Sequence, residues 1–284
     1  MNLAYVGVEF LAGYLAHSLA LVSDAVHNLT DVPSMSLSLV ALYAQNRPAD
    51  PRRTYGYQRS GVLAAFVNAL VLVGVAGYIF YHAYGRLRVP VAVDTRLMAW
   101  VALAGVGVNG AIALLLWRGR RDLNLRSVLL HNAGDAASSA AILGGALAIA
   151  YTGWTGLDPL LSFAIGAAVL WGCGGMLRET TNILLEGTPA EVSVEAVARA
   201  MLKVPGVEEV HDIHIWSLAA HLHALSCHVR IGEMSTRESE KILDQLKALL
   251  AREFHISHTT IQFEPRARPA PAAYFSAGTH PDKS

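Results

Sequence analysis

The sequence has little charge and little cysteine for its length. Only 15% of its 284 residues are charged, 53% are hydrophobic, and the formal net charge is zero. This composition is not that of a soluble domain and is typical of a membrane protein. The Lys and Arg residues fall in short loops and form no basic face, so nothing indicates a nucleic-acid partner.

Two further absences narrow the possibilities. The only cysteines are Cys173, in an apolar run, and Cys227, in an alternating run, so the sequence predicts neither a disulfide framework nor a Cys-based zinc site. The amino terminus lacks the positively charged segment and the small-residue cleavage site of a signal peptide. We expect it to begin the first membrane span.

Six apolar segments are each long enough for the roughly 20 residues that a spanning helix needs. They are Leu3–Leu21, Ser23–Tyr43, Gly61–Tyr84, Leu97–Trp117, Ser127–Tyr151 and Leu157–Leu177. A tight turn is expected around His17 and Ser18. The loops that follow the second and fourth segments are rich in arginine, and the positive-inside rule therefore places both loops and both chain termini in the cytoplasm.

A His-Asn-x-x-Asp motif occurs twice inside these apolar segments. His27 and Asp31 form the first copy, and His131 and Asp135 form the second. A spacing of four residues puts both side chains on one helix face. Two such faces packed together bring two imidazoles and two carboxylates into reach of one divalent cation of the zinc kind.

Both motifs fall at about the same depth in the membrane. Asp135 lies nine residues beyond Arg126, which is roughly 13 Å at the helical rise of 1.5 Å per residue. Asp31 lies eleven residues beyond Ala20, or roughly 16 Å from the other side. Ionisable groups near the midplane are costly and mark ion pathways, whereas a single such group is often only a hydrogen bond between helices.

After Glu186 the composition becomes that of an ordinary soluble domain. The pattern predicts helix, strand, strand, helix and strand, which suits a small α+β layer of the ferredoxin-like sort. The expected elements are Ser193–Val204, Val207–Leu218, Leu222–Ile231, Thr236–Phe254 and Thr259–Phe263. A second metal site is plausible here at His211, His228 and Glu264, with His258 or Gln262 nearby.

Taken together, these residues resemble the cation diffusion facilitators, and the similarity covers nearly the whole chain. The segments that carry it are Ser18–Asp31, Arg52–Tyr57, Leu63–Asn68, His131–Asp135 and Val210–Leu218. The resemblance implies a homodimeric six-helix transporter with a cytoplasmic ferredoxin-like domain, which exports a divalent metal in exchange for protons.

By position, the resemblance also implies the roles of individual residues. His27, Asp31, His131 and Asp135 match the transport ligands, and a His-Asp pair on both helices is similar to the zinc-preferring branch. In the cytoplasmic domain, the matching metal ligands are His211, His228 and Glu264, while Gln262 stands where some relatives have His.

The chain departs from the family pattern at two places. Asp50 is retained from a loop zinc site of some relatives, but Arg53 and Tyr57 replace its histidines, so we expect that loop site to be absent. Gly61 stands where many relatives have Glu.

The sequence therefore predicts an α-helical membrane protein with a transport domain at 1–186, a cytoplasmic metal-binding and dimerisation domain at 187–265, and a disordered tail at 266–284. We expect proton-coupled zinc efflux across the inner or plasma membrane, with Zn²⁺ as cargo and regulatory ion, no organic cofactor and no enzyme activity. A membrane-anchored metal sensor or scaffold is the first alternative. An intramembrane metallohydrolase is the second, although no His-Glu-x-x-His helix supplies its catalytic base.

Overall fold

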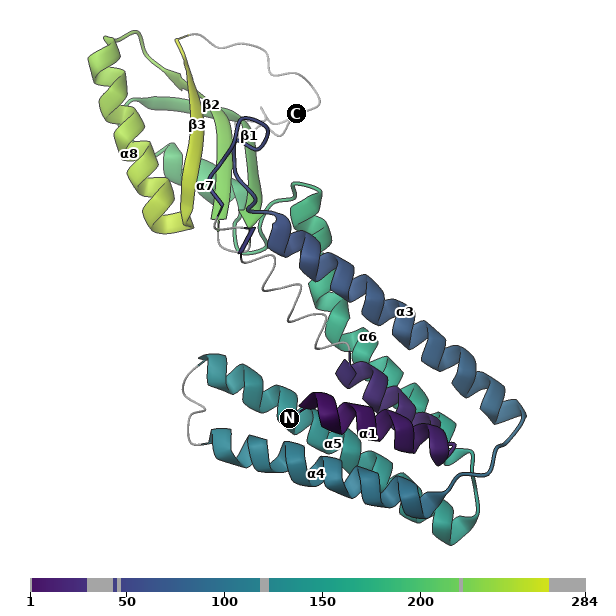
Figure 1. Cartoon of the computed structure of the whole chain (residues 1–284). Helices are drawn as coiled ribbons and strands as arrows, with labels where there is room; N and C mark the ends of the chain where they lie inside the picture. Colours follow the sequence, from purple (N-terminus) through teal and green to yellow (C-terminus); the bar gives the residue numbers. More distant parts are fainter. Residues whose placement is uncertain (1, 30–42, 45–46, 118–122, 220–221, 266–284) are drawn as a thin grey trace. The chain divides into compact units, whose positions relative to one another are not determined.

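A computed structural model describes residues 2–29, 43–44, 47–117, 123–219 and 222–265 of the chain. The chain divides into two compact units, one formed by residues 1–37 and 67–177 and the other by residues 38–66 and 178–284. Figure 1 shows the helices and strands of both units along the chain.

Long helices form the amino-terminal part of the chain (Figure 1). They are α1 (Asn2–Leu15), α3 (Ser60–Arg88), α4 (Thr95–Leu116), α5 (Leu123–Thr152) and α6 (Leu157–Leu184), and residues 19–29 are also helical. Among the described residues, four helices are long and apolar enough to cross a membrane: α3, α4, α6 and the Val128–Thr152 part of α5. The predicted class, a helical membrane protein with a second, α+β domain, is confirmed. Most of the predicted second span lies outside the described residues.

The first helix ends earlier than the sequence predicted. Hydropathy carried the first span to Leu21, but α1 stops at Leu15, and a turn with a positive φ of 54° at His17 follows. A buried carboxylate starts the next helix: Asp158 accepts hydrogen bonds from Ser18 Oγ at 2.6 Å and from the backbone nitrogen of Leu19 at 2.7 Å. The tight turn expected at His17 and Ser18 is thus confirmed, and the predicted end of the span at Leu21 is wrong.

Close packing between helices surrounds the amino-terminal hairpin. Buried Met98 and Ala102 of α4 share a core cluster with Leu21 and with Ile142 of α5. At Gly105 of α4 a Cβ atom would collide with the hydroxyl groups of Tyr5 and Ser139, so only glycine fits that contact without movement. Small residues are the common means by which membrane helices approach closely.

The second unit contains a three-stranded sheet with two helices. Its elements are α7 (Val194–Met201), β1 (Val207–Ala219), β2 (Leu222–Ile231), α8 (Thr236–Phe254) and β3 (Ile256–Glu264). The strand order is β1-β2-β3, with β1 antiparallel and β3 parallel to the central strand. One core joins apolar residues of both helices to the sheet, among them Met201, Leu246 and Val229.

Serine caps fix where the two helices of this domain begin. Ser193 Oγ accepts from the backbone nitrogen of Ala196, and Ser235 forms a reciprocal capping box with Glu238. Such caps satisfy amide groups that a helix start leaves unpaired. The predicted bounds of β2 and α8 agree with the structure, and β3 begins three residues before the predicted Thr259.

Candidate metal sites

Three of the four predicted transport ligands line one cavity. His27, from the helix at residues 19–29, faces the same space as His131 and Asp135 of α5. The cavity measures about 490 Å³, and its remaining lining is mostly apolar. The fourth predicted ligand, Asp31, lies outside the described residues. The structure thus brings together side chains from two helices that are far apart in the sequence.

The second motif has the spacing that its sequence implied. His131 Nε2 lies 3.6 Å from Asp135 Oδ2, one helical turn further along α5. Both side chains are donors that zinc accepts: a neutral imidazole nitrogen and a carboxylate oxygen. Without a thiolate among them, these ligands suit borderline cations such as zinc or cobalt.

The polar residues around this cavity have separate partners. Asn132 donates to the backbone oxygen of Val128 within α5, at 2.9 Å. Ser138 donates to Asp24 Oδ1 at 2.6 Å and so connects α5 to the helix that carries His27. Ser138 therefore joins two helices beside the cavity.

A second cluster lies on the sheet of the cytoplasmic domain. His211 of β1 pairs with His228 of β2, and His228 pairs with Gln262 of β3, two residues before Glu264. His211, His228 and Glu264 each offer a ligand atom, and these atoms lie within 4.8 Å of one another. The sheet register therefore brings together the three residues that the sequence predicted.

The Glu264 carboxylate sits between the two imidazoles of this cluster. Its Oε2 is 3.4 Å from His211 Nε2, and its Oε1 is 3.3 Å from His228 Nδ1. His211 Nδ1 and Glu264 Oε2 are buried and have no hydrogen-bond partner among the described residues. Buried polar atoms without partners are costly, and a metal ion bound by Glu264 Oε2 removes that cost for the carboxylate.

Asp212 lies beside His228, and the sequence pattern did not identify it as part of the cluster. The strand pairing shifts between His211 and His214, and Asp212 has a positive φ of 49° at this irregularity. Its Oδ1 lies 3.0 Å from His214 Nε2, and its Oδ2 lies 3.7 Å from His228 Nε2. A carboxylate on the far side of a ligating imidazole fixes its tautomer and orientation. A bulge changes the direction of a side chain in a way that simple alternation does not reveal.

Gln262 and His258, the two further residues that the sequence placed near this site, lie in different positions. Gln262 Nε2 donates to Glu264 Oε1 at 3.0 Å and so borders the cluster. The ring of His258 instead makes an edge contact with Tyr55, with 5.1 Å between the ring centroids. Gln262 is therefore next to the proposed site.

Cys227 faces the core of this domain, away from the cluster. The side chain is buried, and burial, together with the negative charge of Asp212, raises the pKa of its thiol to about 12. A thiol with such a pKa is protonated at neutral pH, whereas metals bind the thiolate. The cluster therefore uses nitrogen and oxygen donors.

Asp50 organises a turn in the loop before α3. Its Oδ1 accepts from the backbone nitrogens of Arg52 and Arg53 at 2.7 and 2.9 Å, and Tyr57 donates to Oδ2 at 3.3 Å. The backbone N–H of Arg52 contributes most to lowering the pKa of Asp50. Both oxygens of this carboxylate therefore accept hydrogen bonds from residues of the same loop.

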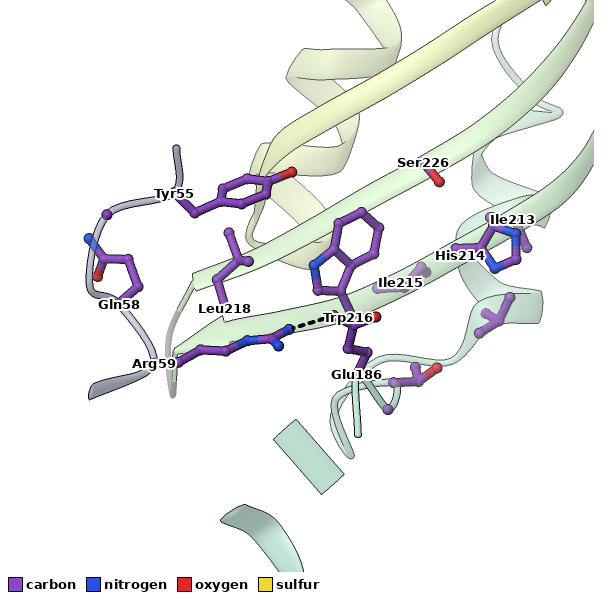
Figure 2. Close-up of a pocket in the computed structure, with 14 residues that line it drawn as sticks. Tyr55, Gln58, Arg59, Glu186, Ile213, His214, Ile215, Trp216, Leu218 and Ser226 are labelled. Atoms are coloured by element: carbon purple, nitrogen blue, oxygen red, sulfur yellow. Dashed lines mark hydrogen bonds and ion pairs between the residues drawn. The ribbon is translucent and has the colours of Figure 1, made fainter. Parts of the chain in front are cut away.

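A cavity in the second unit adjoins β1. It measures about 780 Å³, and Figure 2 shows the Tyr55 to Arg59 loop, the chain around Glu186 and the Ile213 to Leu218 part of β1 around it. Arg59 forms an ion pair with Glu186 at 3.3 Å. His214, which contacts Asp212, also lines this cavity. The cavity therefore extends to the residues beside the metal cluster.

Comparison with known proteins agrees with this architecture. The family described as "Cation efflux transmembrane domain" matches residues 1–185, and "Cation efflux protein, cytoplasmic domain" matches residues 189–266. The chain is 39% identical over 257 residues to the metal cation efflux system protein CzcD of Cupriavidus metallidurans, covering 90% of this chain and 81% of that protein.

Two further relatives cover similar extents. A cadmium, cobalt and zinc/H(+)-K(+) antiporter of Bacillus subtilis is 35% identical over 271 residues, covering 94% of this chain and 87% of that protein. The zinc transporter ZitB of Escherichia coli is 35% identical over 274 residues, covering 95% and 87%. A solved structure, the metal-bound carboxy-terminal domain of the Cupriavidus CzcD transporter, is 41% identical and covers 26% of this chain and 99% of that chain, with a TM-score of 0.24.

The chain belongs to the cation efflux family of multi-pass membrane transporters. The resemblance to the cation diffusion facilitators is thereby confirmed, and so is the prediction that the protein is a metal cation transporter and not an enzyme.

Proposed function

We propose that this protein exports zinc or a chemically similar divalent cation from the cytoplasm in exchange for protons. The observation that carries the proposal is the cavity into which His27, His131 and Asp135 project from two separate helices. Asp31, one turn beyond His27 in the sequence, supplies the fourth ligand. Relatives named for zinc, cadmium, cobalt and proton antiport support this cargo and this coupling.

Coupling follows from competition between metal and protons for the same atoms. An imidazole nitrogen binds a metal only when its lone pair is free, so metal binding releases protons and protonation expels the metal. Histidine titrates near neutral pH, where small differences across a membrane change its charge. Helices that rock around the cavity then expose it to one side and to the other in turn.

The arrangement in the membrane is part of the same proposal. Residues 1–186 form the transport domain and residues 187–265 the cytoplasmic domain, and the tail predicted at 266–284 lies outside the described residues. The chain lies in the plasma membrane with both termini in the cytoplasm, as the arginine-rich loops predict. The match to a cytoplasmic domain family named for dimerisation supports a homodimer.

Zinc accumulation in cells that lack their own zinc exporters tests the transport site. Expression of the wild-type chain should lower cellular zinc, and His131→Ala should abolish the decrease because one of the four ligands is lost. His82→Ala is a matched control, because His82 is an exposed histidine of α3 that stacks on Tyr78 and does not line the cavity. Equal efflux by wild type and His131→Ala would refute the proposed site.

We also propose that the cytoplasmic cluster senses metal. A cation held by His211, His228 and Glu264 stabilises one arrangement of the cytoplasmic domain, and a ligand shifts a conformational equilibrium by its difference in affinity for the two states. Removal of residues 192–264 should then change how transport depends on cytosolic metal. Unchanged dependence in the truncated protein would contradict a sensing role.

A further inference from the structure

Two buried carboxylates in the amino-terminal unit have no part in the proposed transport site. Glu9 of α1 is 0% exposed, and Asp24, in the helix at residues 19–29, is 1% exposed. They interact with each other, and Asp24 also interacts with His27 of the proposed transport site. No ion pair joins either of them to Lys or Arg in the described part of the chain. Buried negative charge of this kind requires compensation by a cation or by protons.

The oxygen atoms around these carboxylates are incompletely used. Glu9 accepts two long hydrogen bonds, from Tyr5 Oη at 3.3 Å and from Asn28 Nδ2 at 3.4 Å. Asp24 Oδ1 accepts from Ser138. The second oxygen, Asp24 Oδ2, is buried without a hydrogen-bond partner among the described residues. One carboxylate oxygen thus has its lone pairs available to a ligand.

A serine hydroxyl adds a second available oxygen at the same place. Ser139 Oγ is buried and has no hydrogen-bond partner in the described ranges. Ser139 Oγ and Tyr5 Oη both lie over Gly105, where a Cβ atom would collide with each of them. The absence of a side chain at Gly105 therefore keeps open the space into which these hydroxyls project.

We propose that Glu9, Asp24, Tyr5 and Ser139 form a second, all-oxygen binding position for a divalent cation. Two carboxylates match the charge of such an ion, and carboxylate and hydroxyl oxygens are hard ligands. The proposed transport site differs from this all-oxygen position, because the transport site includes the imidazoles of His27 and His131.

This position adjoins the transport cavity. Ser138 lines the cavity and also donates to Asp24. Asp24 precedes His27 by three residues on the same helix, a rise of about 4.5 Å. A cation held here lies about one helical turn from the ligands of the cavity.

Binding of Mn²⁺ to the purified full-length protein tests the proposal, because Mn²⁺ accepts oxygen ligands and its free concentration is measurable by electron paramagnetic resonance. The background is a triple variant, His131→Ala, Asp135→Ala and Glu264→Gln, which removes ligands of the other two proposed sites. Any Mn²⁺ binding that the triple variant loses relative to the wild type belongs to those two sites. Failure of the proposed transport site can therefore be told apart from failure of the all-oxygen site, which is tested within the triple variant.

In that background, one Mn²⁺ ion per chain should remain bound. Addition of Glu9→Gln or Asp24→Asn, which preserve side-chain size, should raise its Kd by about 10-fold or more. The control is Asp94→Asn, since Asp94 is an exposed carboxylate that caps α4 and Asn caps a helix equally well. No bound Mn²⁺ in the background, or the same loss of affinity in the control, would overturn the proposal.

Ser139→Ala separates a metal-binding role from a structural one. If the hydroxyl only stabilises the fold through its interactions with Asp24 and Tyr5, this change lowers the thermal midpoint of the metal-free protein and leaves the Kd for Mn²⁺ unchanged. Metal binding predicts a higher Kd with an unchanged thermal midpoint for the metal-free protein. An unchanged Kd in Ser139→Ala would exclude this hydroxyl as a ligand and contradict the proposed set.

Discussion

His228 is the residue on which the geometry of the cytoplasmic cluster depends most. One ring nitrogen faces Glu264 and the other faces Asp212, at 3.3 and 3.7 Å. If the metal takes the nitrogen on the Glu264 side, the Asp212 carboxylate accepts from the opposite N–H and holds the ring in place. The sequence identified the three ligands by alternation, but it could not identify Asp212, because that residue's direction depends on an irregular strand pairing and a positive φ.

Replacement of Asp212 tests this arrangement. We expect Asp212→Asn to weaken zinc binding at the cytoplasmic cluster by about 10- to 100-fold, the usual effect of losing a carboxylate behind a ligating histidine. Asn tolerates the positive φ at this position, so the strand should stay intact. Competition with a chelating dye measures the affinity. Asp244→Asn, an exposed carboxylate of α8, is the control and should bind as wild type does.

At the scale of elements, the apolar patterns predicted where helices and strands lie better than where they end. The predicted sixth span stopped at Leu177, whereas α6 continues to Leu184 and ends before Glu186, which has a positive φ of 60°. Hydropathy detects the membrane part of a helix, but the backbone hydrogen bonds continue into its polar part. The first span was predicted too long. The turn that ends it at His17 depends on Asp158, which lies 141 residues further along the chain.

Asp158 should contribute strongly to the stability of the amino-terminal unit. Its carboxylate accepts from Ser18, Leu19 and Ala20, and it also forms an ion pair with Arg86 at 3.3 Å. We expect Asp158→Ala to lower the free energy of unfolding by about 3 to 5 kcal/mol, because it leaves buried partners without their acceptor.

An exposed helix cap provides the comparison for this prediction. Asp94 caps α4 by accepting from the backbone nitrogens of Arg96 and Leu97, and it is exposed. Asp94→Ala should cost about 1 kcal/mol. Denaturant titration of both variants in detergent measures the difference, and equal losses would contradict the role given to Asp158.

Two glycines of α4 offer a second matched pair. A Cβ atom at Gly105 would meet close neighbours, whereas nothing lies within 4 Å of a Cβ at Gly107. Gly107→Ala should therefore raise stability by up to about 1 kcal/mol, the difference in helix propensity. Gly105→Ala should lower the thermal midpoint, since Tyr5 and Ser139 must move. A lower midpoint for Gly107→Ala than for Gly105→Ala would be inconsistent with this packing.

For the whole molecule, the sequence predicted the two kinds of structure and the ligands of each proposed site. It did so because spacing of four on a helix and of two on a strand puts ligands on one face. Glu9, Asp24 and Asp158 were not identified as a buried network. Their contacts join α1, α5 and α6 to the helix at residues 19–29 or to the turn before it, and no local spacing records partners that are distant in sequence.

Zinc uptake into inside-out membrane vesicles with an imposed proton gradient tests the central claim most directly. The wild-type chain should accumulate zinc only while the interior is more acidic, and Asp135→Ala should take up no more than vesicles without the protein. Loss of one midplane carboxylate removes both a metal ligand and a proton acceptor from the cavity. Equal, gradient-independent uptake by the two proteins would contradict a proton-coupled site at His27, His131 and Asp135.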